Sequence, residues 1–248
     1  MLLFPTDYAA PPDLALRSGT ALRLTFIVPV YNEAGTVAQV LDRVEALPFA
    51  KQIIVVDDGS TDGTSEVLAA WSERSGGLLI RQPNRGKGAA IRTAIPHVDG
   101  DVVVVQDADG EYDPADVPRL IEPIARGAAD VVLGSRFSGG QPQRAHLFWH
   151  LMGNRFLSLL TNVLFNTTIS DMETGYKVFR ADILRSLDLR ENGFGIEPEI
   201  TAKICKKRCR IYELPIAYYG RTYVEGKKIT WKDGVRAIGV LLAVRVRS

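Results

Sequence analysis

Three acidic residues at alternating positions follow a strongly apolar run near the middle of the chain. Val102–Val105 are four consecutive valines, and Asp107, Asp109 and Glu111 come shortly after them. Carboxylates this close repel one another, so a cation is their natural partner. Oxygen ligands suit Mg²⁺ or Mn²⁺, which typically bind through one or two carboxylates and the phosphates of a substrate. The alternative is a polar loop after a strand, without a metal.

Two further segments carry residue types that suit ligand binding. The apolar run Ile53–Val56 also ends in acids, Asp57 and Asp58. Further on, Lys87 stands between two glycines in Gln82–Ala89 (QPNRGKGA), just before an expected helix. Such a turn can present backbone N–H groups and a lysine to a phosphate. It does not match a Walker A loop, and an ordinary turn is the alternative.

These segments need a sheet that brings several strand ends together. Apolar runs alternate with helical patterns through the first 140 residues, which is typical of βαβ units. We expect strands near 24–30, 52–57, 78–81, 101–106 and 130–134, and helices near 35–47, 62–74, 87–97 and 114–125. The fold class is therefore α/β, with a mostly parallel sheet, helices on both faces and the polar residues at its carboxyl edge.

Composition excludes several classes of protein. The chain has 248 residues, 46% of them apolar, and a formal net charge of +1, which argues against a dedicated nucleic-acid binder. Its two cysteines offer no disulfide framework. No segment is apolar for long enough to span a membrane, and residues 1–22 are expected to form an N-terminal arm.

Two later segments are candidates for contact with a membrane. Ala145–Phe165 is apolar over most of its length and predicts an amphipathic helix at an interface, or else a core helix. Residues 236–248 form an expected amphipathic helix, open to interpretation as the start of a membrane region. Its apolar residues Ile238, Val240, Leu241 and Val244 stand beside Arg236, Arg245 and Arg247. Apolar residues flanked by arginine suit anionic lipid; packing in the core or on a twin subunit is the alternative.

Six short motifs follow one another along the chain. They are PVYNE (Pro29–Glu33), VVDDGS (Val55–Ser60), NRGKG (Asn84–Gly88), QDADGE (Gln106–Glu111), GSRF (Gly134–Phe137) and DMETGYKVFR (Asp171–Arg180). Taken together and in this order, they resemble an inverting family 2 glycosyltransferase of the GT-A (Rossmann-like) fold. Within that family the chain is most similar to dolichyl-phosphate mannose synthases and polyprenyl-phosphate glycosyltransferases, and the resemblance covers about residues 24–239.

The resemblance implies a role for individual residues. Asp109 and Glu111 match the metal-binding positions, and Asp171 and Glu173 match acids near the acceptor, so Asp109, Arg136, Asp171 and Glu173 are the expected catalytic set. The expected nucleotide-binding residues are Pro29, Tyr31, Glu33, Val56, Asp58, Lys87, Gly88, Asp107, Ala108 and Asp109. Arg136 and Arg144 match arginines that grip the acceptor phosphate. Arg221, Lys227 and Lys228 match a basic loop that closes over the diphosphate.

The implied activity is that of a hexosyltransferase of the EC 2.4.1 type. A sugar would pass from a UDP- or GDP-hexose to dolichyl or undecaprenyl phosphate, with inversion and with Mg²⁺ or Mn²⁺; we favour UDP. A phosphate monoester has a second pKa near 6, so it is already a nucleophile at neutral pH and needs no strong base. For a soluble or cell-wall hydroxyl acceptor, the first alternative, Asp171, Glu173 or Glu199 would have to act as base. A non-catalytic sugar-nucleotide-binding subunit is the alternative of another class.

The same resemblance suggests an organisation and a location. Residues 23–235 would form one glycosyltransferase domain, with a nucleotide-binding half (23–140) and an acceptor half (141–235) that supplies acceptor-side helices. The protein is expected in the cytoplasm, peripherally attached to the cytoplasmic face of the membrane directly or through a small membrane partner. A homo-oligomer is left open.

Overall fold

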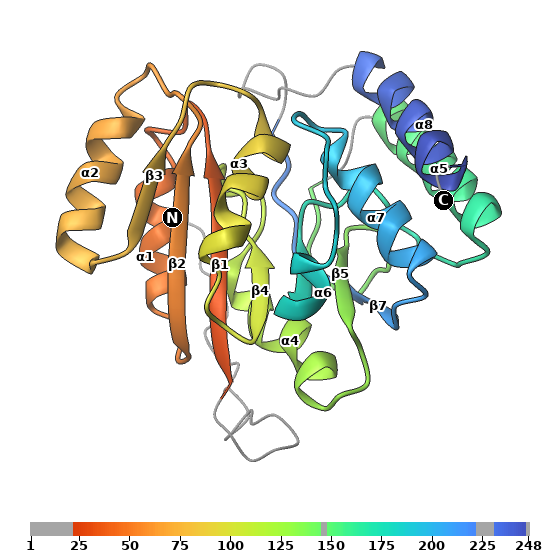
Figure 1. The fold of residues 1–248 in the computed structure, drawn as a ribbon, viewed down its shortest axis with the longest axis horizontal. Coiled ribbons are helices and arrows are strands. Elements are labelled where there is room, and N and C mark those ends of the chain that lie inside the picture. The colour runs from red at the N-terminus through yellow and green to blue at the C-terminus, as the bar shows by residue number, and fades with distance from the viewer. Residues whose placement is uncertain (1–21, 145–147, 222–230, 247–248) are drawn as a thin grey trace.

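The structure is a computed structural model that describes residues 22–144, 148–221 and 231–246 (Figure 1). The strands are β1 (Arg23–Val30), β2 (Ala50–Asp57), β3 (Leu78–Arg81), β4 (Val102–Val105), β5 (Val131–Ser135), β6 (Lys177–Arg180) and β7 (Ile211–Pro215). The α-helices are α1 (Val37–Glu45), α2 (Thr64–Ser75), α3 (Lys87–Ala94), α4 (Val117–Ala125), α5 (Phe148–Phe165), α6 (Ala181–Arg185), α7 (Ile196–Lys206) and α8 (Trp231–Val246). Two short 3-10 helices, Ile95–His97 and Pro114–Asp116, adjoin α3 and α4.

All of these strands join one sheet in the order β3-β2-β1-β4-β6-β5-β7. Neighbouring strands are parallel except for β6, which runs antiparallel to both β4 and β5. The prediction of a mostly parallel α/β sheet is therefore confirmed. Because β6 enters between β4 and β5, residues that follow Phe165 in sequence lie next to the strand that carries the acidic motif.

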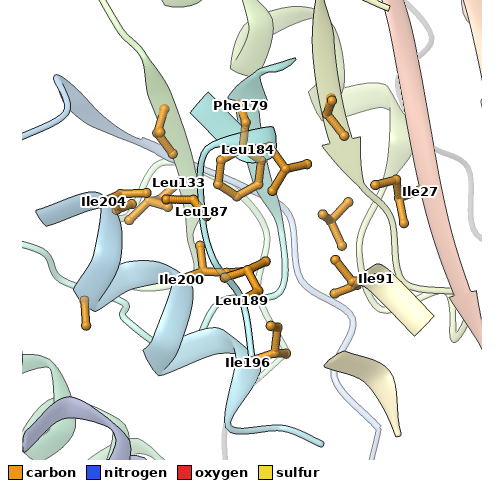
Figure 2. Packing of buried hydrophobic residues seen from close by; sticks show 14 of the residues in the cluster. Ile27, Ile91, Leu133, Phe179, Leu184, Leu187, Leu189, Ile196, Ile200 and Ile204 are labelled. Atoms are coloured by element: carbon orange, nitrogen blue, oxygen red, sulfur yellow. The ribbon is translucent and has the colours of Figure 1, made fainter. Parts of the chain in front are cut away.

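The sheet is covered on both faces, which explains the continuous valine run of β4. Val102 and Val104 pack with Phe26 against α1, α2 and α4, whereas Val103 and Val105 face the opposite cluster. That second cluster includes side chains of α3, α6 and α7, and Figure 2 shows it around Phe179 and the leucines that follow. Since successive side chains of a strand point to opposite faces, only a doubly covered strand can be apolar at every position.

Helix boundaries differ from the sequence expectations by one to three residues at several ends. The start of α2 shows the local cause, because Gly63 adopts a left-handed conformation (φ 92°) and becomes the residue that caps the helix. Asp62 contributes to this turn, since its Oδ1 accepts a hydrogen bond from the Thr64 amide at 3.1 Å. The helix expected over 87–97 ends as an α-helix at Ala94 and continues as the 3-10 turn that contains Pro96.

The second half of the chain forms more regular structure than the sequence indicated. β6, β7, α6 and α7 were not predicted, and α8 begins at Trp231 instead of near 236. α8 packs beside α5 and α7 (Figure 1). Its Val240, Leu241 and Val244 are buried in the core, so the interpretation of these three residues as a lipid contact was wrong. They face α5 and α7 because a helix presents residues three and four apart on one side.

α5 and α8 also expose apolar side chains on their outer faces. On α5 these are Phe148, Trp149, Phe156, Leu159 and Val163, and on α8 they are Val235, Leu242 and Val246. The most exposed are Trp149 (80%) and Val246 (82%). Among the described residues, no helix combines the length and the apolar character that crossing a bilayer requires.

The central strands should carry much of the stability. Phe26 on β1 is fully buried, so Phe26→Ala removes a ring from a close-packed core and should lower the free energy of unfolding by about 3–5 kcal/mol. Val163→Ala, on the exposed face of α5, should change it by less than about 0.5 kcal/mol. Urea unfolding followed by circular dichroism measures both, and equal effects would contradict the core described above.

Candidate active site

The carboxyl ends of β1, β2 and β4 open onto a cavity of about 830 Å³. This is the edge at which open α/β sheets bind ligands, and the volume suits a ligand of nucleotide-sugar size. Residues from the first half of the chain that line it include Pro29, Tyr31, Glu33, Asp58, Lys87, Asp107, Ala108, Asp109 and Glu111. Those from the second half include Arg136, Phe137, Trp149, Asn154, Glu173, Phe194, Glu197, Tyr218 and Arg221.

The three acids after β4 lie together in the cavity wall, as the sequence predicted. The Glu111 amide donates to Asp109 Oδ1 at 3.0 Å, and the Tyr218 hydroxyl donates to Glu111 Oε2 at 2.7 Å. Burial, together with the charges of Asp107 and Glu111, raises the pKa of Asp109 to about 7. Three like charges in a partly buried wall repel one another, so a cation bound beside them would stabilise the cluster.

Arg221 supplies positive charge at this cluster. Its guanidinium forms two hydrogen bonds with Glu33, at 2.9 and 3.0 Å, and lies 3.4 Å from Asp109 Oδ2. Its backbone amide donates to Glu111 Oε1 at 2.7 Å. Arg221 thus contacts acids from two separate motifs. Lys227 and Lys228, the other members of the expected basic loop, lie outside the described residues.

Lys87 forms ion pairs with two acidic side chains. Its ammonium lies 2.7 Å from Asp107 Oδ1 and 2.9 Å from Glu197 Oε1. Burial alone would lower the pKa of Lys87, but Asp107 and Glu197 outweigh burial and raise it. A Cβ at Gly175 would come within 2.6 Å of Asp107 and 2.8 Å of Lys87, so the DMETGYKVFR motif needs glycine there to admit the ion pair.

The glycine turn before α3 lines the cavity with Gly86 and Lys87, and it also packs against another loop. Gly88 does not line the cavity, and a Cβ there would lie 2.3 Å from the Glu191 carbonyl oxygen. The Ala89 amide, in the first turn of α3, donates to the Asn192 carbonyl at 2.9 Å. Gly88 is therefore required for close packing between two backbones. One of the N–H groups at the start of α3, that of Ala89, is already hydrogen-bonded within the protein.

Asp58 fixes the shape of the nucleotide side of the cavity. Its carboxylate accepts hydrogen bonds from Gln82 Nε2 (2.6 Å), the Arg85 amide (2.9 Å) and the Gly86 amide (2.6 Å). Val56, expected beside it in the nucleotide-binding set, is not part of the cavity lining. Its side chain is fully buried in the core, because alternate residues of β2 point away from one another.

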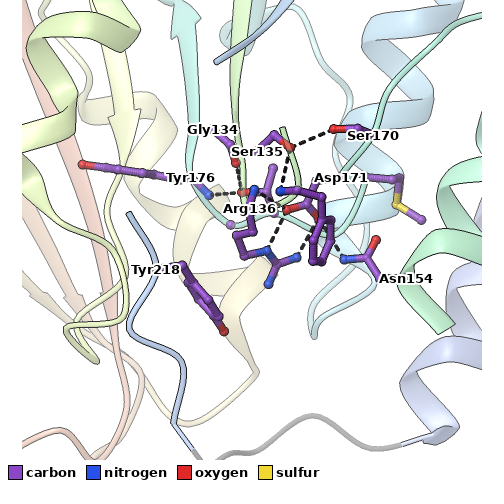
Figure 3. A network of polar contacts seen from close by, with 12 residues as sticks. Gly134, Ser135, Arg136, Asn154, Ser170, Asp171, Tyr176 and Tyr218 are labelled. Atoms are coloured by element: carbon purple, nitrogen blue, oxygen red, sulfur yellow. Dashed lines mark hydrogen bonds and ion pairs between the residues drawn. The ribbon is translucent and has the colours of Figure 1, made fainter. Parts of the chain in front are cut away.

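Arg136 and Asp171 form a buried ion pair on the other side of the cavity (Figure 3). Arg136 Nε and Nη2 donate to the two oxygens of Asp171, both at 2.7 Å, and Asn154 Nδ2 donates to Oδ1 at 2.8 Å. Burial would raise the pKa of Asp171, but the charge of Arg136 and these hydrogen bonds lower it overall. The Tyr218 ring centroid lies 5.1 Å from the Arg136 Cζ, close enough for a cation–π contact.

Two other expected residues lie outside the cavity lining. Arg144 Nη1 donates, at 3.1 Å, to the carbonyl of Gly220, the residue just before Arg221. Glu199 accepts hydrogen bonds from the Arg190 and Glu191 amides and pairs with Lys203 at 2.7 Å. Its oxygens hold the loop before α7, so Glu199 does not face a ligand as the base of a hydroxyl acceptor would.

Sequence reasoning missed several residues that line the cavity, above all Glu197. Glu197 and Glu199 both stand in the first turn of α7, and two helical positions this close in sequence face different directions. Lys177 identifies the inward-facing one, since its ammonium lies 2.5 Å from Glu197 Oε2. A buried lysine in a strand is a signal that an acid must be nearby. Tyr112, Asn154, Phe194 and Tyr218 gave no comparable signal.

Comparison with known proteins shows the family of this chain. The family profile described as glycosyl transferase family 2 matches residues 25–188. The chain belongs to this family. It is 32% identical to the undecaprenyl-phosphate mannosyltransferase of Micrococcus luteus, over 83% of this chain and 87% of that protein. It is also 32% identical to glycosyltransferase AglJ of Haloferax volcanii, over 79% of this chain but only 62% of that protein.

The fold of this family 2 glycosyltransferase is also found among solved structures. Glucosyl-3-phosphoglycerate synthase of Mycobacterium tuberculosis, in complex with Mn²⁺, UDP and phosphoglyceric acid, aligns with a TM-score of 0.71. The alignment covers 92% of this chain and 80% of that one, at 20% sequence identity. The GT-A fold predicted from the motifs is thereby confirmed.

The glycosyltransferase should become more stable when one acid of the cluster is neutralised. The folded protein holds the pKa of Asp109 near 7, above its unfolded value of about 4. The ionised side chain therefore destabilises the fold increasingly as the pH rises from about 4 to about 7. Asp109→Asn should raise the Tm of the metal-free protein at pH 8, leave it unchanged at pH 4, and abolish sugar transfer.

Differential scanning calorimetry at the two pH values measures this effect. Asp188→Asn is the matched control, because Asp188 is exposed and pairs with Arg190 at the surface. A Tm gain at pH 8 that the control shares, or normal turnover in Asp109→Asn, would contradict the role given to the acid cluster.

Proposed function

We propose that this chain transfers a hexose from a nucleoside diphosphate to a polyprenyl phosphate, with inversion at the sugar carbon. The observation that carries the proposal is that one cavity joins the acid cluster to the Arg136–Asp171 pair and to the apolar start of α5. The acid cluster would bind the diphosphate through a metal ion, and Arg136 would bind the acceptor phosphate. The apolar start of α5 would contact the lipid chain. The relatives named for undecaprenyl phosphate transfer support the choice of acceptor.

The residues of the acid cluster fit a divalent ion. Among residues 22–144, 148–221 and 231–246, no three His, Cys, Asp or Glu side chains are arranged as a complete metal site. Mg²⁺ and Mn²⁺ do not require one, because substrate phosphates supply the remaining ligands. Asp109 and Glu111 would hold the ion, and Asp107 would face the ribose and phosphates. When bound, the ion supplies Lewis-acid stabilisation of the charge on the departing diphosphate.

Basic residues of the chain would bind the diphosphate of the donor and the phosphate of the acceptor. Arg221, released from Glu33 and Asp109, would add fixed positive charge to the departing diphosphate. Arg136 is held in one orientation by its two bonds to Asp171. Among the described residues its Nη1 has no hydrogen-bond partner, so this nitrogen can bind an acceptor oxygen. Asp171 thus positions the arginine, and its low pKa makes it a poor base.

A direct assay tests this proposal. Purified protein, a polyprenyl phosphate such as undecaprenyl phosphate, and labelled UDP- or GDP-hexoses should give a glycosylated lipid in Mg²⁺ or Mn²⁺, and EDTA should abolish it. A thermal-shift panel of the same nucleotides identifies the base, since a saturating ligand stabilises by several kcal/mol. We propose UDP; stabilisation by GDP alone would overturn that choice. Product formed only with soluble hydroxyl acceptors would reject the lipid.

Arg136 should affect the acceptor more than the donor. Arg136→Ala removes the guanidinium that would bind the acceptor phosphate, and truncating one partner of a desolvated charge pair across a binding interface costs about 2–5 kcal/mol. The acceptor KM should rise by about 30-fold or more, while the affinity for the nucleotide stays within a few-fold. Lost nucleotide affinity with an unchanged acceptor KM would place Arg136 on the donor side.

We also propose that the outer face of α5 and α8 contacts the cytoplasmic face of the membrane. Residues 148–165 include no acidic side chain, and exposed Arg155 and Arg245 lie on the same two helices as the exposed apolar residues. Apolar side chains flanked by arginine favour the surface of an anionic bilayer. A small membrane partner and a second copy of the chain are the competing occupants of this face.

Vesicle binding tests the membrane contact. Wild-type protein should sediment with liposomes that contain anionic phospholipid, and binding should weaken as salt screens the charges. Trp149→Glu and Leu242→Glu change exposed positions and should reduce binding several-fold without loss of fold. Tyr212→Glu, exposed on β7, is the matched control. Equal binding by all variants, or none by the wild type at low salt, would contradict this assignment.

A further inference from the structure

The part of the cavity wall around Lys87, Lys177 and Arg136 holds one more acid than these three cations can neutralise. Lys87 contacts Asp107 and Glu197, Lys177 contacts Glu197, and Arg136 contacts Asp171. These three cations balance the three acids that they touch. Glu173 is a fourth acid in the same group, and no ion pair joins it to a basic residue of the described chain.

Glu173 lines the cavity, and one of its carboxyl oxygens has no partner in the described protein. Its side chain is part of the cavity lining, together with Arg136 and Asn154. Its Oε1 is buried and has no hydrogen-bond partner among the described residues. A buried carboxylate oxygen without a partner is costly when the group is ionised, so the missing partner favours the neutral acid.

The surroundings of Glu173 favour its neutral form. Burial is the largest influence, and it raises the pKa of Glu173 to about 7. Lys177 and Arg136 lower this pKa, whereas Glu197 and Asp171 raise it, and the net change is upward. Below about pH 7 the acid form of Glu173 therefore predominates, and this form has an O–H group to donate.

We propose that Glu173, as a neutral acid, donates a hydrogen bond to the acceptor's phosphate beside Arg136 and so selects a phosphate acceptor. This inference rests on the proposed function. An ionised Glu173 would repel the phosphate and could donate nothing, whereas the acid form contributes a donor next to the guanidinium. The same residue would need the opposite charge state to act as base for a hydroxyl acceptor.

The pH dependence of the acceptor KM distinguishes these roles. In the wild type, the acid fraction of Glu173 falls about tenfold for each pH unit above its pKa. The KM for undecaprenyl phosphate should therefore rise about tenfold or more between pH 6.5 and 8.5. Glu173→Gln keeps the size of the side chain and a permanent donor, so its acceptor KM should stay low across this range with kcat within a few-fold of wild type.

Two further variants complete the experiment. Glu173→Ala has neither charge nor donor and should show a raised acceptor KM at every pH. Glu66→Gln makes the same exchange at an exposed site on α2 and should behave as wild type throughout. The donor KM and circular dichroism should be unchanged in all of them, which separates a local effect from a loss of fold.

Each result decides a separate question. Coincident pH profiles of wild type and Glu173→Gln would overturn the inference while leaving the proposed function intact. A large loss of kcat in Glu173→Gln, with an unchanged KM, would make Glu173 a general base instead. If the wild type forms no lipid product at any pH, the proposed function fails and this inference fails with it.

Discussion

Carboxylates gathered in a wall that excludes much of the water impose the main constraint on this structure. A buried charge without a partner is strongly destabilising, so each acid at the carboxyl edge of the sheet requires a cation or a proton. Lys87, Lys177, Arg136 and Arg221 meet this requirement, and each comes from a different segment of the chain. The site is therefore assembled only when the whole domain has folded.

The topology of the sheet makes these pairings possible. β6 runs antiparallel between β4 and β5, which brings the motif from Asp171 to Lys177 beside the acids that follow β4. Gly175 allows the closest approach, and the stacked rings of Tyr112 and Tyr176, 5.1 Å apart, fill the space beneath. An antiparallel strand in a parallel sheet thus brings the Asp171–Lys177 segment against the acids that follow β4.

Local patterns predicted the first half of the fold because long apolar strands alternate there with amphipathic helices. They failed for β6, whose four residues include a lysine and an arginine, and for the half-buried β7 at the edge of the sheet. In the site, the motif acids were recognisable from their types and spacing. The direction of Glu197 and the packing role of Gly88 depend on which distant loops lie against them, which no local pattern records.

The contact between Arg221 and the acid cluster has a consequence for the order of events. Under the proposed function, a bare divalent ion would have to compete with a cation that is tethered nearby and therefore present at a high effective concentration. An ion already chelated by a nucleoside diphosphate would bring anionic oxygens that offer the displaced guanidinium a new partner. The exchange would then conserve ion pairs on both sides, so metal and nucleotide would enter best as a single complex.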